Sequence, residues 1–364
     1  MSTNGRPSLP SRLLIAMPNW VGDLTLATPA LRAIRSLLPD AHIAALVRSH
    51  LREILDGGDW ADEVILWRVE KTRPGRHRGF LGLAQELREK RFDTAVLLTN
   101  SFRSALLARL AGIPRRIGYD RDGRGLLLTD KLLPDKSNGR YVPVPMVRYF
   151  NAIARYLGAR NLPTRPELYT TPEEESAVDR LLDSLGVSAR RPIVVINPGA
   201  SFGSAKCWLP ERFGEVGDAL AAEFGAAVLI SCGPKERDIA QAVAESMRSP
   251  GLLLDRPMLT LGPLKALIRR SHLLVTNDTG PRHFAIAFGV PVVTLFGSTD
   301  PQWTETNCPL ERQIRVRVHC GPCMKRVCPL DHRCMTRITA PMVLAAARPL
   351  LAERLAAPTS CGTL

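Results

Sequence analysis

Long apolar runs are missing from this chain of 364 residues. No stretch approaches the roughly 20 apolar residues that a membrane-spanning helix needs. The first apolar segment, residues 13–17, is followed at once by Pro18 and is too short for the core of a secretion signal. These absences predict a cytoplasmic protein without a transmembrane anchor.

Aromatic residues are scarce as well, at 5% of the chain, and they are not interleaved with basic residues. Base stacking on aromatic rings is the usual means of binding single-stranded nucleic acid, and no helix-turn-helix or zinc-finger pattern occurs either. We therefore expect no nucleic-acid partner. The net charge of +14 instead favours a polyanionic substrate or an anionic membrane surface, unless it reflects only a solvated, arginine-rich exterior.

The remaining pattern alternates short apolar runs with amphipathic segments, which is typical of parallel α/β architecture. A linker rich in proline and polar residues, 158–172, separates two such sets. We expect two Rossmann-like domains, residues 1–165 and 173–338, that face each other across a cleft. A C-terminal helix and tail, 339–364, is free to pack back on the first domain. The expected strands are 13–17, 43–47, 64–67, 94–98, 193–197, 227–231, 273–276 and 291–296.

The most informative segment is 272–283, HLLVTNDTGPRH, in which a buried strand delivers Asp278 to the start of a helix. Pro281 is tolerated in the first helical turn, and Asp278 or Thr279 can serve as N-cap. Unpaired N–H groups and the positive end of the helix dipole make such a turn an anion site, and Gly280 allows a close approach. Asp278 adds an acceptor for sugar hydroxyls. The alternative is an ordinary strand–turn–helix corner with a capping aspartate.

Three further loops follow expected strands, and each contains one polar residue suited to the same chemistry. Asp23 lies at a helix start, which favours the ionised carboxylate that a general base needs. Lys206 ends a long loop of small residues without a Walker sequence, and it can neutralise a diphosphate. Glu236 can bind ribose hydroxyls. The simpler alternatives are a helix cap for Asp23, a solvated loop residue for Lys206 and an acidic residue in the first turn of a helix for Glu236.

Taken together, these motifs resemble glycosyltransferase family 9, the ADP-heptose:lipopolysaccharide heptosyltransferases. The matching segments are Gly22-Asp23, NPGASFGSAKCWLPERF, CGPKE and TNDTGPRHFAIAFGVPVVTLFGSTDP, and they occur in the expected order between about Leu13 and Leu351. The NDTGPRH form and a cysteine-rich segment are more similar to heptosyltransferase II than to heptosyltransferase I.

The resemblance implies a GT-B fold, with the acceptor on the first domain and the nucleotide sugar on the second. It implies inverting, metal-independent transfer of heptose from ADP-L-glycero-β-D-manno-heptose to the heptose of the Kdo–lipid A inner core. Asp23 matches the catalytic base. Which residue of 200–203 touches the donor is left open by the sequence. The donor-binding set implied is Ser201, Lys206, Glu236, Asp278, Thr279, Gly280 and His283.

Other functions are compatible with parts of this pattern. They are transfer of the heptosyltransferase I or III type, an epimerase or hydrolase of nucleotide sugars, and a non-catalytic nucleotide-sugar-binding protein. The presence of Asp23 beside a full donor set argues against the last of these.

The basic first half has a specific explanation under this resemblance, because the acceptor carries phosphates and Kdo carboxylates. We expect Arg103, Arg115, Arg116 and Arg148 to contact these anions. We also expect a monomer that attaches peripherally to the cytoplasmic leaflet of the inner membrane.

Four of the eight cysteines lie close together in the sequence, at Cys320, Cys323, Cys328 and Cys334. A C-x-x-C start and four thiolates are compatible with a structural zinc or iron–sulfur site, although the spacing is not that of a standard zinc ribbon. Free thiols are the equal alternative, and disulfides are disfavoured in a reducing compartment. The catalysis implied above requires no cofactor.

Overall fold

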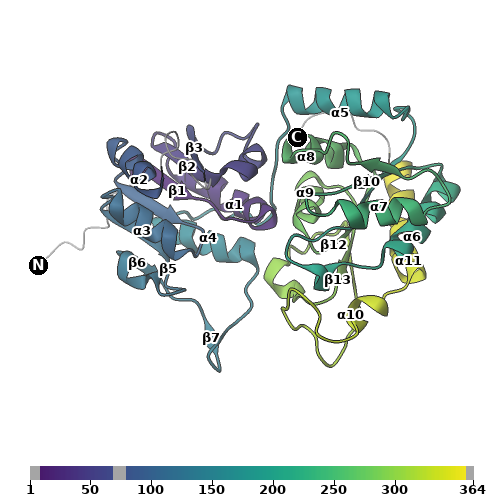
Figure 1. Cartoon of the computed structure of the whole chain (residues 1–364). Helices are drawn as coiled ribbons and strands as arrows, with labels where there is room; N and C mark the ends of the chain where they lie inside the picture. The colour runs from purple at the N-terminus through teal and green to yellow at the C-terminus, as the bar shows by residue number, and fades with distance from the viewer. Residues whose placement is uncertain (1–8, 69–78, 358–364) are drawn as a thin grey trace, which may run out of the picture. The chain divides into compact units, whose positions relative to one another are not determined.

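A computed structural model of the chain describes residues 9–68 and 79–357, and the chain divides into two compact units (Figure 1). Unit 1 comprises Met1–Tyr169 with Gln302–Thr306, and unit 2 comprises Thr170–Pro301 with Asn307–Leu364. None of the helices in the described ranges is both long and apolar enough to cross a membrane.

Unit 1 is built on a six-stranded parallel sheet in the order β3-β2-β1-β4-β5-β6. Helices α1 and α4 pack together, as do α2 and α3, so that the sheet is covered by two helical layers (Figure 1). The strands are β1 Arg12–Ala16, β2 His42–Arg48, β3 Glu63–Trp67, β4 Thr94–Leu97, β5 Arg115–Tyr119 and β6 Asp130–Leu132. The helices are α1 Val21–Leu37, α2 Phe80–Glu89, α3 Phe102–Leu110 and α4 Met146–Leu157. A small hairpin joins β7 Lys136–Ser137 to β8 Arg140–Tyr141.

Unit 2 repeats this topology, with a parallel sheet in the order β11-β10-β9-β12-β13-β14. Helices α6, α7 and α11 pack in one layer, and α5, α8 and α9 in another (Figure 1). The strands are β9 Ile193–Asn197, β10 Ala227–Ser231, β11 Leu252–Leu254, β12 Leu273–Asn277, β13 Val292–Phe296 and β14 Glu311–Arg315. The helices are α5 Pro172–Ser184, α6 Pro210–Phe224, α7 Arg237–Ser246, α8 Leu261–Arg270, α9 Gly280–Phe288, α10 Arg333–Thr336 and α11 Ala340–Ala356.

The central strands form because their apolar runs are buried on both faces of each sheet. Val194 on β9 pairs with Leu273 on β12, and both side chains are fully buried. This near-continuous apolar sequence is what a parallel sheet covered by helices requires. The predicted α/β class with two Rossmann-like sheets is therefore confirmed. In such sheets, ligands bind beyond the carboxyl ends of the strands, where the strand order reverses; in unit 2 this point lies between β9 and β12.

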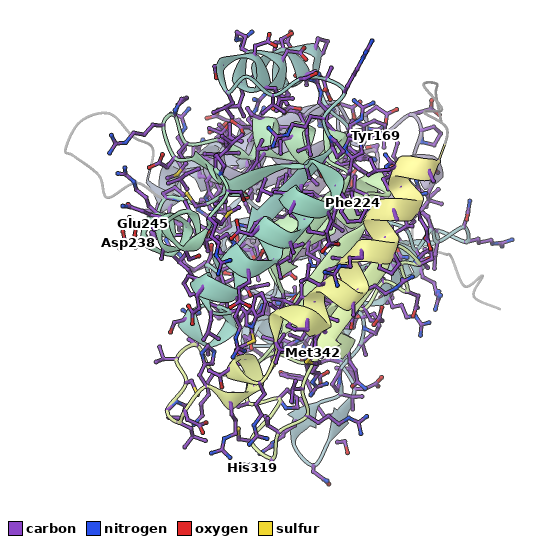
Figure 2. All side chains as sticks on the ribbon, turned by 90° about the vertical axis from the view of Figure 1, so that its right-hand side faces the viewer. Tyr169, Phe224, Asp238, Glu245, His319 and Met342 are labelled. Atoms are coloured by element: carbon purple, nitrogen blue, oxygen red, sulfur yellow. The ribbon has the colours of Figure 1, made fainter. Side chains whose placement is uncertain are left out.

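Helix α11 packs against α6 and the sheet of unit 2. Figure 2 shows it running from Met342 past Phe224, the last residue of α6. Its Leu350 and Leu351 are buried in the core of this unit. The sequence left this helix free to return to the first domain, and the structure places its apolar face in the second unit.

Candidate functional site

The loops that follow β9 and β12 meet through an ion pair. Lys206 ends a short 3-10 helix, Ser204–Lys206, and its Nζ lies 2.7 Å from Oδ2 of Asp278. The same Nζ donates to the main-chain carbonyl oxygen of Asp278 at 2.6 Å. Asn277 fixes the two loops together, because its amide nitrogen donates to the carbonyl oxygen of Pro198 at 2.6 Å. Two residues predicted to contact a diphosphate sugar are thus side by side.

Asp278 is almost fully buried, and protein groups contact both of its carboxylate oxygens. Thr299 donates to Oδ2 at 2.8 Å, and Nη1 of Arg282 lies 3.3 Å from Oδ1. Burial would raise the pKa of Asp278, but Lys206 and Arg282 outweigh it and hold this pKa well below the ordinary value. Asp278 is therefore a permanent anion that holds Lys206 in place.

Ser201 and Glu236 form a second polar pair at the same edge of the sheet. Ser201 Oγ donates to Oε1 of Glu236 at 3.2 Å, and the N–H of Gly233 donates to Oε2 at 2.9 Å. Gly199 packs directly against this carboxylate, and a Cβ atom there would overlap it. A carboxylate held in this way offers hydrogen-bond acceptors of the kind that bind a ribose diol.

Thr279 is the N-cap of α9, and Gly280 and Pro281 open the helix. The Thr279 side chain makes no capping hydrogen bond and donates instead to Oδ1 of Asn197 at 3.3 Å. The cap residue therefore does not occupy the first-turn N–H groups of α9. This arrangement keeps the anion-binding capacity expected of a helix start.

His283 lies in the first turn of α9 and is fully enclosed by protein. Burial, with the nearby charge of Arg282, lowers its pKa to about 3, so the imidazole is neutral at physiological pH. Its Nδ1 is buried and has no hydrogen-bond partner among the residues that the structure describes. His283 thus stands beside Asp278 as a neutral group.

Asp23 occupies a comparable position in unit 1. It is the third residue of α1, the helix that follows β1, and it is half-buried. The helix N-terminus favours its ionised form. The structure thus places Asp23 in the first turn of the helix that follows β1, a central strand of the first sheet.

Residues 80–333 match the family model described as "Glycosyltransferase family 9 (heptosyltransferase)". The chain belongs to glycosyltransferase family 9. It is 30% identical over 317 residues to the lipopolysaccharide heptosyltransferase 2 of Escherichia coli (strain K12), covering 84% of this chain and 87% of that protein. The family membership and the enzyme class predicted from the sequence are confirmed.

Two solved structures share the fold of this family 9 enzyme. The Escherichia coli ADP-heptose LPS heptosyltransferase II is 27% identical, with a TM-score of 0.78, and the match covers 95% of this chain and 100% of that one. A family 9 glycosyltransferase from Veillonella parvula is 23% identical, with a TM-score of 0.79, and the match covers 94% of this chain and 97% of that one. The second likeness concerns the fold alone. The roles of individual site residues remain predictions.

The four arginines predicted to bind the acceptor of this glycosyltransferase differ in their surroundings. Arg115 lies 3.2 Å from a carboxylate oxygen of Asp130. Arg116 donates to the carbonyl oxygens of residues 113, 114 and 127, so its guanidinium has a structural function. Arg103 and Arg148 are exposed on α3 and α4. These two are better placed to meet a ligand.

Arg48, which the sequence interpretation missed, lies at the carboxyl end of β2. Its Nε donates to Oδ1 of Asn19 at 3.0 Å, and its guanidinium lies over the ring of Trp67 at 4.7 Å. Burial and the neighbouring charge of Arg103 lower the pKa of Arg48. The sequence could have indicated Arg48 by its place at the end of a strand, because such residues line the ligand-binding edge of a parallel sheet.

The structure gives no support to the zinc or iron–sulfur site that was one of the two equal alternatives for the cysteine-rich segment. Within the described ranges, no group of three or more histidine, cysteine or acidic side chains is arranged to hold a metal ion. The thiols instead line the wall of a pocket of about 180 Å³. None of the four forms a disulfide in the structure. They are Cys320, Cys323, Cys328 and Cys334.

This segment, which starts near His319 (Figure 2), contacts the loops that follow β9 and β13 through main-chain atoms and the ring of His332. The carbonyl oxygen of Arg326 accepts from the N–H of Ala205 at 3.0 Å, and a ring nitrogen of His332 lies 3.1 Å from the carbonyl oxygen of Ala205. The N–H of Met324 donates to the carbonyl oxygen of Ser298 at 2.8 Å. The segment therefore supports the loop that ends at Lys206.

Proposed function

We propose that this family 9 enzyme transfers L-glycero-D-manno-heptose from ADP-heptose to the inner core of lipopolysaccharide, as a heptosyltransferase II. The single observation that carries this proposal is the Lys206–Asp278 pair at the start of α9, since it joins a cation, an anion and a helix N-terminus at one sheet edge. Similarity to curated heptosyltransferase 2 relatives over most of the chain supports the choice of reaction.

The donor binds to unit 2 in this proposal. Glu236, oriented by Ser201, accepts hydrogen bonds from the ribose hydroxyls. Lys206 and the N–H groups of the first turn of α9 contact the diphosphate, and Thr279 and Gly280 form this turn. Asp278 accepts from heptose hydroxyls while it holds Lys206, and His283 lines the same corner as a neutral group. Negative charge grows on ADP as the glycosidic bond breaks, and Lys206 with the helix N–H groups stabilises it without a metal.

Asp23 is the general base in this proposal. It takes the proton from the acceptor hydroxyl as the oxygen attacks the anomeric carbon, and ADP leaves from the opposite face. A single displacement of this kind inverts the anomeric configuration. An ionised carboxylate at a helix N-terminus is suited to this step because it is already deprotonated at neutral pH.

The acceptor carries phosphates and Kdo carboxylates, so it requires cations on unit 1. Arg103 is the best-supported of the predicted contacts, since it is exposed and close enough to Arg48 to lower the pKa of that residue. Arg148 is exposed as well, whereas Arg115 and Arg116 are partly engaged by the protein. The net charge of +14 supports peripheral attachment to the anionic cytoplasmic leaflet. Co-sedimentation with anionic liposomes at low salt, lost at high salt, is the expected result; no sedimentation at low salt contradicts the attachment.

Three acceptors test the proposed reaction: inner cores with no heptose, with one heptose and with two heptoses. Incubation with ADP-heptose should extend the acceptor that already carries one heptose. Extension only of the heptose-free core indicates a heptosyltransferase I, and extension only of the two-heptose core indicates a heptosyltransferase III. Hydrolysis of ADP-heptose without transfer, or binding without turnover, overturns the proposal.

A further inference from the structure

Four alternating charges connect the edge strand β14 to the Lys206–Asp278 pair. Glu311 on β14 binds Arg282 on α9 through two contacts, Nε to Oε1 at 2.5 Å and Nη2 to Oε2 at 2.9 Å. Nη1 of Arg282 then lies 3.3 Å from Oδ1 of Asp278, and Oδ2 of Asp278 lies 2.7 Å from Nζ of Lys206. The four charges thus alternate in sign without a break from Glu311 to Lys206.

The inner part of this network is sealed from solvent. The side chain of Arg282 is 0% exposed and that of Glu311 2%, whereas Asp278 is 7% and Lys206 12% exposed. Breaking one partner of a buried ion pair leaves an uncompensated charge, which is strongly unfavourable. Exposure rises toward Lys206, so the network is anchored in the core and ends at the donor loops.

Glu311 is itself fixed by neighbours other than Arg282. Thr294 on β13 donates to its Oε1 at 2.6 Å, and Gln313 donates to its Oε2 at 3.1 Å. The guanidinium of Arg282 also lies over the ring of Phe296, 5.0 Å from the centroid. A two-point contact between a carboxylate and a planar guanidinium adds geometric specificity to charge. Arg282 therefore has one position, and it meets Asp278 from that position.

We propose that Glu311 and Arg282 are positioning residues that hold the Asp278 carboxylate in the orientation in which its second oxygen fixes Lys206. Glu311 balances the positive charge of Arg282. Arg282 therefore restrains Asp278 through Oδ1 alone, and Oδ2 stays paired with Lys206. This inference rests on the proposed function, because it assigns the network to the alignment of Lys206 with the donor diphosphate.

The test is a double-mutant cycle of E311Q and K206M, measured as kcat/KM for ADP-heptose. E311Q keeps the shape of the side chain and removes its charge. We expect E311Q to lower this parameter about tenfold in the wild-type background and to have almost no effect in the K206M background, with the acceptor KM unchanged. A merely structural role would lower activity by the same factor in both backgrounds.

Glu174 provides a matched control in the same unit, since it forms a buried ion pair with Lys265 at 3.2 Å and is not part of the network. E174Q should destabilise the fold about as much as E311Q does. It should nevertheless change kcat/KM for ADP-heptose by the same factor in the wild-type and K206M backgrounds. If E311Q does not fold, T294V removes one hydrogen bond to Glu311 without changing any charge, and the same dependence on Lys206 is expected. Equal effects of E311Q or T294V with and without Lys206, or a folded E311Q variant with wild-type kinetics, overturn the inference while the proposed function stands. Absence of heptosyl transfer by the wild-type protein overturns both.

Discussion

The Nζ atom of Lys206 lies within hydrogen-bond distance of both a carboxylate oxygen and the main-chain oxygen of Asp278, at 2.7 and 2.6 Å. Protein groups thus hold the cation at the start of α9. Groups that are fixed in place before the reaction stabilise a developing charge without the cost of reorganisation. The contacts that fix Lys206 in unit 2 therefore favour the proposed departure of ADP.

Replacing Lys206 by alanine should weaken donor binding and turnover together. A charge-assisted hydrogen bond contributes about 1.5–3 kcal/mol, so we expect losses of about 10- to 100-fold in donor affinity and a further loss in kcat. Titration calorimetry with ADP-heptose and steady-state kinetics measure the two effects. Arg180→Ala, at an exposed arginine on α5 of the same unit, is the control and should change neither. Unaltered kinetics for Lys206→Ala count against its role.

Replacing Asp23 by alanine should nearly abolish transfer and leave donor binding intact. Loss of a general base lowers the rate by about 10²- to 10⁴-fold. Both kcat for transfer and the affinity for ADP-heptose should be measured on the same preparation of the variant. Asp40→Ala, an exposed aspartate of the same unit, should behave as wild type. Lost affinity with intact turnover would refute the assignment.

Replacing Gly199 by alanine tests Glu236 without altering it. The added methyl group would occupy the space of the Glu236 carboxylate and displace it from Ser201. We expect about a tenfold loss of ADP affinity, comparable to that of Glu236→Ala. In a protein that already carries Glu236→Ala, the glycine substitution should have no further effect on ADP binding. A second loss of the same size would mean that Gly199 acts independently of Glu236.

The neutral, buried His283 should make the fold sensitive to acid. Its pKa is about 3 in the folded state, against an unperturbed value of 6.5. Above pH 6.5 both states are neutral; as the pH falls from 6.5 toward 3, the unfolded chain binds a proton that the folded chain excludes. Stability is therefore lost as the pH falls through this window, by about 1.4 kcal/mol per pH unit.

Denaturant unfolding of the wild type and of His283→Gln at pH 7.5 and pH 5.0 measures this contribution. The wild type should lose about 2 kcal/mol more than the variant over this interval, since only it carries the titrating group. Other titrating groups, including Asp278, are common to both proteins and cancel in the comparison. Equal losses would show that His283 is protonated in the folded protein or is less enclosed than the structure indicates.

The eight strands predicted from the sequence all occur, because each is a short apolar run in a sheet that is buried on both faces. Most of the strands that were missed carry polar residues, whereas β11, Leu252–Leu254, is apolar but only three residues long. β5 begins with Arg115-Arg116, and the edge strand β14 has the sequence ERQIR. Edge and near-edge strands can be polar because fewer of their faces are covered, and periodicity then gives no signal. The positions of the polar loops were easier to predict, since every polar loop chosen follows a strand in the inner part of a sheet.

Contacts between distant residues could not be predicted in this way. Arg282 and Glu311 are 29 positions apart, and only the pairing of β13 with β14 brings them together. The same limit applies to the cysteines, whose spacing left a metal site and free thiols as equal alternatives; in the fold the four thiols line one pocket. Arg116 was chosen for its charge, yet neighbouring carbonyl oxygens engage its guanidinium.

Mass spectrometry and NMR of a one-heptose inner-core acceptor after incubation with ADP-heptose test the central claim most directly. The account predicts a mass increase of one heptosyl residue, formed with inversion at the anomeric carbon and dependent on both Asp23 and Lys206. An unchanged acceptor beside free heptose and ADP, or a product with retained configuration, would contradict it.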